Sequence, residues 1–307
     1  MQIRTDLAME CRKFAGKIDG VTCRTIWHGQ IEETWVSVEN QEAAKALSKA
    51  CGKYVTLSYA AMPYADANER RELAEAISGV LRGLLPSSGE ILIIGLGNRY
   101  ITADALGSRV LEGLLITRHM KEAVSESICG RLRGVCAVAP GVLGITGIET
   151  AEMVKGIVEH TKPVAVIAID ALAAREVNRI CTTIQITDTG ISPGSGVGNH
   201  RLGITKDTVG VPVIAIGVPM VVYAAAIAKD ALSLLVSDLD IQDTHESAID
   251  ALMEKVAARE LGEMVVTPRE VDAFVGRVAT IISLGLNTAL QPRLTQEEIS
   301  FLSHDGM

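Results

Sequence analysis

Aromatic residues are scarce in this chain: they make up 3% of its 307 residues, and the formal net charge at pH 7 is −8. Proteins that bind RNA or DNA use aromatic rings to stack on bases and basic surfaces to hold phosphates. A chain with so few aromatic residues and a net negative charge has little material for base stacking or for a basic surface. We therefore expect no direct nucleic-acid partner.

Long apolar runs are missing as well. No stretch of about 18 uninterrupted apolar residues occurs, and the N-terminus lacks the apolar core of a signal peptide. The nearest candidate, residues 209–229, is divided by two glycines and two prolines. The six cysteines include no Cys-x-x-Cys pair, and a chain of this size needs no disulfide staples. These absences predict a cytoplasmic protein without a membrane span.

Hydrophobic residues make up 48% of the chain, which is ample for a large core. Apolar runs of strand length alternate with segments of helical periodicity, and this order is typical of an α/β fold with a parallel or mixed sheet. No repeat or linker divides the chain, so we expect a single domain over residues 1–307, with N-terminal strands and C-terminal helices packed on a central sheet. We expect strands within 21–60 and at 91–96, 164–169, 183–187 and 211–216, and helices at 69–85, 102–115, 149–161, 221–235, 245–261 and 268–289, with a short helix starting at Ala171.

Two aspartates follow the most apolar of these runs. Asp170 comes directly after residues 164–169, and Asp104 follows residues 91–96 by a glycine-containing turn. In open α/β sheets, ligands bind beyond the carboxyl ends of the strands. Asp104 also has a plain structural interpretation, because an acid in the first turn of a helix complements the helix dipole. Asp170 is harder to explain in that way, since an isolated carboxylate at the end of a buried strand is costly to ionise.

If Asp104 and Asp170 meet, they form a carboxylate pair that shares a proton and titrates in two separated steps. One carboxylate then activates water while the other donates a proton, as in aspartic-type hydrolysis. A metal site is the competing interpretation, although the six histidines form neither His-x-x-x-His nor HExxH. We expect no bound cofactor, and we leave a divalent cation at Asp104 and Asp170 open.

Other site types fit the sequence less well. Gly95-x-Gly97 has Tyr100 where the dinucleotide-binding fingerprint needs a third glycine, and no phosphate-binding Gly-Lys-Ser/Thr loop occurs. The serine in Gly194-Ser-Gly-Val-Gly198 lies in a loop at the wrong spacing for a nucleophile elbow. That loop, residues 188–205, holds five glycines and a proline, and a loop so long inside a compact domain is usually functional.

Several long motifs resemble those of the germination protease family of spore-forming bacteria. They run in order from residue 3 to about 235 and resume near residue 264. The matching stretches are Arg4-Thr-Asp-Leu-Ala-Met-Glu10, residues 95–107, 139–150, 167–175, 188–199 and 211–219, Met264-Val-Val-Thr-Pro-Arg-Glu-Val-Asp272, and residues 285–290.

The resemblance implies an endopeptidase that degrades small acid-soluble spore proteins in the spore core during germination. It implies an atypical aspartic mechanism with Asp104 and Asp170 as the essential pair. It also implies a three-layer αβα sandwich of the phosphorylase/hydrolase-like kind, resembling the hydrogenase-maturation peptidases, whose acidic nickel ligands keep a cation open by analogy. We expect further site-shaping residues on the turn and the glycine-rich loop: Asn98, Asp188, Ser195, Asn199 and His200.

Family members are homotetramers made as zymogens that remove their own prosegment. This chain starts only three residues before Arg4, so we expect either a nearly absent prosegment or a sequence close to the mature form. The stretch between about 236 and 263 is shorter than in longer members and reads as an acidic helix. Two alternatives stay open: a catalytically inactive relative that binds spore proteins, and a metal-assisted peptidase. A nucleoside phosphorylase-like enzyme would need a phosphate-binding arginine that the sequence does not place.

Overall fold

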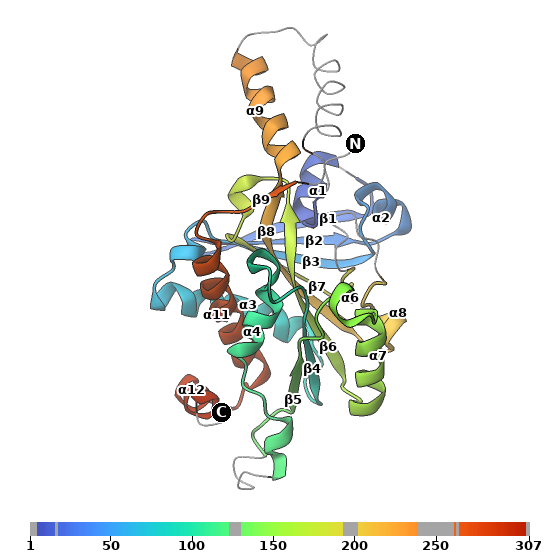
Figure 1. The fold of residues 1–307 in the computed structure, drawn as a ribbon, viewed down its shortest axis with the longest axis vertical. Helices are drawn as coiled ribbons and strands as arrows, with labels where there is room; N and C mark the ends of the chain where they lie inside the picture. Colours follow the sequence, from blue (N-terminus) through green and yellow to red (C-terminus); the bar gives the residue numbers. More distant parts are fainter. Residues whose placement is uncertain are drawn as a thin grey trace.

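The computed structural model of the chain describes residues 5–15, 18–122, 130–192, 202–238, 261 and 264–304. Within these ranges the strands form one mixed sheet of nine strands (Figure 1). Its strand order is β1-β2-β3-β7-β8-β6-β4-β5, and β9 pairs with β8. The strands are β1 (Val21–His28), β2 (Ile31–Val38), β3 (Gly52–Ser58), β4 (Ile91–Gly95), β5 (Val135–Val138), β6 (Ala165–Ala174), β7 (Thr183–Thr187), β8 (Val213–Tyr223) and β9 (Val265–Val266).

The sheet has an antiparallel half and a parallel half. Strands β1, β2, β3 and β7 pair antiparallel, and β7 joins β8 in the same sense. Strands β8, β6, β4 and β5 run parallel. Strands β4 and β6 are buried on both faces, which explains why their sequences are nearly unbroken apolar runs.

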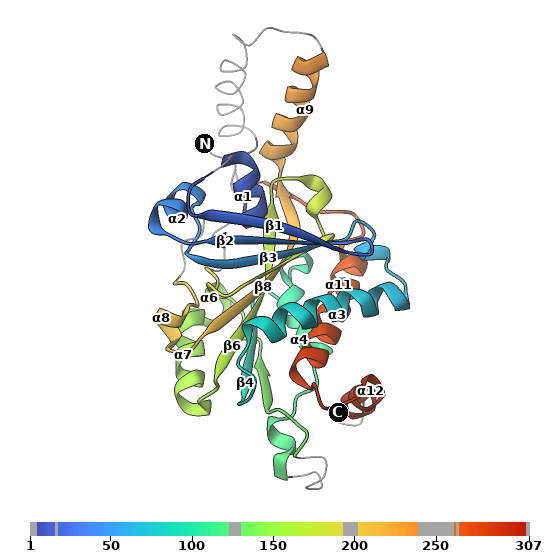
Figure 2. The same cartoon turned by 180° about the vertical axis from the view of Figure 1, so that it is seen from behind.

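Helices cover both faces of this sheet, so the predicted three-layer αβα arrangement is confirmed (Figures 1 and 2). One face carries the large core under α3, α4 and α11. On the other face, α1 and α2 cover the antiparallel half, and α7 and α8 cover the parallel half. The described helices are α1 (Ala8–Ala15), α2 (Gln41–Leu47), α3 (Ala67–Leu84), α4 (Leu106–Glu112), α6 (Leu143–Thr146), α7 (Thr150–Thr161), α8 (Lys206–Val209), α9 (Ala224–Asp238), α11 (Val271–Leu290) and α12 (Gln296–His304), with 3-10 turns η1 (Met62–Tyr64), η2 (Thr102–Asp104), η3 (Arg118–Glu122) and η4 (Val177–Arg179).

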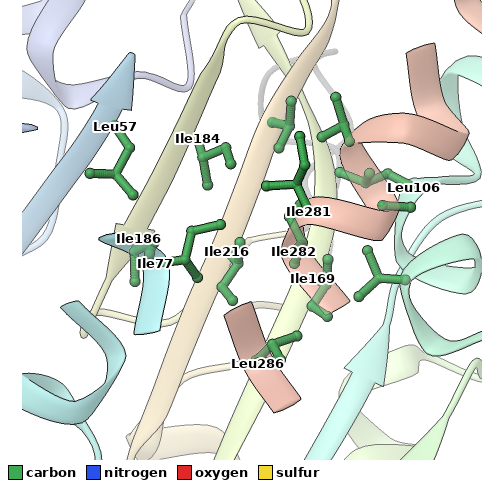
Figure 3. Close-up of a cluster of buried hydrophobic side chains, with 14 of the residues drawn as sticks. Leu57, Ile77, Leu106, Ile169, Ile184, Ile186, Ile216, Ile281, Ile282 and Leu286 are labelled. Atoms are coloured by element: carbon green, nitrogen blue, oxygen red, sulfur yellow. The ribbon is translucent and has the colours of Figure 1, made fainter. Parts of the chain in front are cut away.

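The large core is built from branched aliphatic side chains. Ile77 of α3 and Ile282 of α11 point toward Ile169 of β6 and Ile216 of β8, and all four are fully buried (Figure 3). Helix α11 is also long and apolar enough, by composition, to cross a membrane. However, 67% of its most apolar window is buried, and it packs against α3 and α4. Its apolar character is that of a core helix.

Helix α3 shows why one prediction held. It begins at a capping box in which Asp66 accepts the amide of Glu69 and the Glu69 carboxylate accepts the amide of Asp66. It ends at Leu84, and the capping residue Leu85 directly precedes Pro86. Both signals are local, and the predicted helix over 69–85 is confirmed.

Several other boundaries were predicted wrongly. No helix starts at Ala171, because β6 continues to Ala174 alongside β8. Strand β8 likewise runs to Tyr223, so the helix expected from 221 begins at Ala224. The helix expected over 102–115 is the turn η2 followed by α4, and α11 starts at Val271 instead of Pro268. The helix expected over 245–261 falls outside the described residues, apart from position 261.

Candidate active site

Asp104 is delivered by the turn that follows β4. The chain leaves β4 through Gly97, whose φ of +90° lies in the left-handed region that glycine tolerates. A Cβ atom at Gly97 would lie 2.0 Å from the carbonyl oxygen of Asp104, so only glycine allows this close approach. The amide of Asn98 donates to Asp104 Oδ2 over 2.7 Å. The turn therefore orients the half-buried carboxylate of Asp104 through the backbone.

Asp170 is held on a strand. It lies within β6 rather than beyond its end, so the sequence-based placement was off by several residues. Only 5% of Asp170 is exposed. Its side chain continues the row of Val166 and Ala168, which faces α7, and its Oδ1 accepts the amide of Ala171 over 3.0 Å.

The neighbour of Asp170 on β8 is a glycine that makes room for the Leu172 side chain. In the pairing register Asp170 stands opposite Gly217 of β8, and Gly217 stands opposite Gln185 of β7. A Cβ atom at Gly217 would lie 2.4 Å from Leu172 Cδ1. Since Gly217 has no side chain, the Leu172 side chain occupies the space above it, on the same face of the sheet as Asp170 and Gln185.

Both aspartates line one cavity of about 590 Å³. Its described lining includes residues that follow α2 (Ser48–Ala50), residues that precede α6 (Gly141 and Val142) and Thr150 at the start of α7. The charged side chains among its described lining are three acids and one base: Asp6, Asp104, Asp170 and Lys49. Burial raises the pKa of Tyr54, another lining residue, so its hydroxyl is a neutral donor, and it donates to the Ala50 carbonyl over 2.9 Å.

The N-terminal segment forms one wall of this cavity. The Asp6 amide donates to the Ala173 carbonyl over 3.0 Å, and the Ala173 amide donates to Asp6 Oδ2 over 2.9 Å. Lys49 Nζ and Gln185 Nε2 both donate to the Asp6 carbonyl, over 2.9 and 3.1 Å. Residues far apart in the sequence are thus tied together beside Asp170.

Glu10 fastens the same segment further along. It is 1% exposed, and its carboxylate accepts the amides of Arg175 and Glu176 over 3.0 and 2.9 Å. The Thr5 hydroxyl also donates to it. These bonds fix the chain immediately after β6 and hold the N-terminal wall in place.

Known proteins share nearly the whole length of this chain. A family model described as germination protease matches residues 2–257. The germination protease of Caldanaerobacter subterraneus subsp. tengcongensis is 43% identical, and the match covers 98% of each chain. Those of Clostridium tetani (98% of this chain, 99% of the relative) and Bacillus subtilis (98% and 97%) are 42% and 38% identical.

The chain belongs to the germination protease family. It is therefore a peptidase, and its substrate is a protein. Among solved structures, a nickel–iron hydrogenase maturation protease from Thermococcus kodakarensis matches 46% of this chain and 80% of its own, at 24% identity and a TM-score of 0.29. A likeness that weak carries no conclusion about the site.

The structure places the predicted site residues in different surroundings. Asp104 and Asp170 share the cavity, while Asn98 acts through its amide on Asp104, and its side-chain oxygen accepts the Tyr100 amide over 3.0 Å. Asp188 is exposed, does not line the cavity, and accepts the Lys53 amide over 2.8 Å, so its position is that of a structural contact. Ser195, Asn199 and His200 lie outside the described residues.

Sequence reasoning missed Asp6, Lys49 and Gln185. A signal existed for Gln185, because an amide in the middle of the buried strand Thr183–Thr187 needs polar partners. Asp6 lies inside the stretch Arg4–Glu10 that resembles the family, but nothing in the sequence singled it out there, and no pattern pointed to Lys49. Within the described ranges, no group of three or more His, Cys, Asp or Glu side chains gathers in a way that could hold a metal ion.

Proposed function

We propose that this member of the family is an endopeptidase that degrades small acid-soluble spore proteins, and that Asp104 and Asp170 are its acid–base pair. One observation carries the proposal: both carboxylates line a single cavity although 66 residues of sequence separate them. Asp170 lies on β6, and Asp104 lies on the turn that follows β4, the neighbouring parallel strand. The sequence contains no nucleophile-elbow motif around a serine, so it offers no such alternative to the aspartate pair.

In the proposed reaction, one carboxylate takes a proton from water as the water oxygen attacks the carbonyl carbon of the scissile bond. The other carboxyl, in its protonated form, gives its proton to the carbonyl oxygen. When the tetrahedral intermediate collapses, the first carboxyl protonates the leaving nitrogen and the second recovers the proton from the intermediate. Water is added across the bond and both groups return to their starting states. Either aspartate fits either role.

The test is proteolysis of a purified small acid-soluble spore protein by the wild type, Asp104→Asn and Asp170→Asn. An amide cannot exchange the proton, so each variant is expected to lose about 10²–10⁴-fold in kcat. Thermal unfolding of each variant checks that the fold survives. Full activity in either folded variant would exclude the pair.

Two outcomes separate this proposal from its alternatives. Tight binding of the spore protein without cleavage by the wild type would identify an inactive, spore-protein-binding relative. Loss of activity on chelation, with rescue by one divalent metal, would identify a metal-assisted peptidase at the same carboxylates. Activity that is unchanged by chelation supports the aspartic-type reaction.

The setting of the enzyme follows from its proposed substrate. Small acid-soluble proteins reside in the spore core, so we place the enzyme in that cytoplasmic compartment. We also propose that it binds neither DNA nor a membrane directly. We also propose a homotetramer, which analytical ultracentrifugation tests directly. Zymogen control is tested by N-terminal sequencing of the protein before and after germination, since removal of a prosegment shifts the first residue.

A further inference from the structure

Along the edge of β6 that faces β4, the main-chain groups of successive residues form hydrogen bonds with different segments of the chain. The amide of Val166 donates to the Pro212 carbonyl, so the main-chain groups of even-numbered residues in β6 face β8. Those of odd-numbered residues face the opposite edge, where β4 lies. There the amide of Leu96 donates to the Ile169 carbonyl over 2.8 Å.

Ala171 is the next odd-numbered residue on this edge. The pairing of β6 with β4 ends at Ile169, so Ala171 has no partner from β4. If β4 continued, the amide of Asn98 would stand opposite the Ala171 carbonyl, two residues past the Leu96 bond. The turn at Gly97 redirects that amide to Asp104 Oδ2. Within the described part of the chain, no amide of a turn or loop and no side chain donates to the carbonyl oxygen of Ala171, which faces away from β8.

The following position on the edge is occupied again. The amide of Asp6 donates to the Ala173 carbonyl, so a foreign piece of main chain already pairs with β6 there. The open stretch runs from Ile169 to Ala173, about 13 Å at 3.3 Å per residue. It has room for roughly three extended residues, and Leu96, Ala171, Ala173 and Asp6 all line the cavity.

We propose that the polypeptide substrate binds to this stretch as a short extended strand, with one main-chain amide donating to the carbonyl oxygen of Ala171. The inference rests on the peptidase function proposed above. A peptide held there continues the sheet in the place that β4 leaves empty, a recurrent mode of peptide recognition. Because Asp104 and Asp170 line the same cavity, its backbone passes beside both carboxylates.

The geometry limits the pairing to a single amide. The Ala171 amide already donates to Asp170 Oδ1, so this position offers an acceptor and no donor. Amides on either side of the paired residue point away from the edge, because successive groups of an extended chain alternate. We place the scissile amide next to the paired one, where its N–H points away from the edge of β6.

The experiment uses peptides, so the enzyme stays intact. The bond that the wild type cleaves in a small acid-soluble spore protein is first mapped by mass spectrometry. A ten-residue peptide spanning it is made with a reduced, uncleavable scissile bond. In a series of analogues, each of the three amides on either side is replaced by an ester, which removes the N–H and keeps the shape. The inhibition constant of each analogue is measured against cleavage of the unmodified, cleavable peptide. The reduced peptide without any ester is the parent inhibitor of the series.

One ester is expected to weaken inhibition about tenfold, while the esters at the adjacent positions stay within about twofold of the parent. Uniform inhibition across the series, or equal losses at two adjacent positions, would overturn strand addition at Ala171 and leave the peptidase function intact. If the wild type cleaves no spore protein, the proposed function fails, and the inference fails with it.

Discussion

Asp104 and Asp170 reach one cavity from supports of opposite kinds. Asp170 is on a strand paired on both sides up to Ile169, and 5% of it is exposed. Asp104 is half-buried on a 3-10 turn, where one glycine and one amide determine its orientation. The strand supplies rigidity and burial through long-range pairing, whereas the turn supplies direction through local backbone geometry. The two carboxylates should therefore differ in their tolerance of change.

The largest difference is expected when each aspartate is lengthened by one methylene. Asp170→Glu moves a carboxylate that has no room to adjust, and kcat should fall about 100-fold or more, because a displacement of about 1 Å costs that much. Asp104→Glu has more freedom and should lose about tenfold. Steady-state kinetics on the spore protein measure both, with thermal unfolding as the control. Equal losses in the two variants would contradict the proposed difference between the supports.

Gly97→Ala tests the turn. The new methyl would meet the Asp104 carbonyl at 2.0 Å, in a backbone conformation that side chains rarely adopt. We expect a loss of about 2–4 kcal/mol in unfolding free energy, together with a lower kcat.

Gly79→Ala is the matched control for that change, because Gly79 lies in the exposed face of α3 with no atom within 4 Å of an added Cβ. It should stabilise the protein by up to about 1 kcal/mol. Denaturant unfolding measures both variants. A Gly97→Ala protein as stable and as active as the wild type would show that the turn is not under this constraint.

Glu10→Gln tests the long-range support of the strand. The neutral amide keeps one acceptor oxygen for the amides of Arg175 and Glu176 and turns an NH₂ group toward the other. We expect a loss of about 1–3 kcal/mol in unfolding free energy and a smaller drop in kcat/KM.

The same substitution at Glu112 is the control, since Glu112 is 57% exposed and pairs with Arg109 on the surface of α4. Glu112→Gln should change stability by less than about 1 kcal/mol. If Glu10→Gln and Glu112→Gln are equivalent in urea unfolding, the N-terminal segment does not support the end of β6.

The strands near the two aspartates show which structural features the sequence predicts and which it does not. The apolar runs around Ile93 and Ile167 predicted strands buried on both faces, because such burial excludes polar residues. The same pattern failed at Ala171, where β6 continues past Asp170. Its last residues pair with β8, and an alanine-rich stretch gives no local sign of whether a strand or a helix follows.

The sequence by itself determined the α/β class, the helix α3, the two apolar strands and the two aspartates that follow their apolar runs. Each of these depends on neighbouring residues: burial of a run, a cap, a glycine before an acid. Only the tertiary structure decided that Asp6, Lys49 and Gln185 border the same cavity, and that the edge of β6 is open at Ala171. Those features arise where distant segments meet, and contacts of that range leave no periodic mark in the chain.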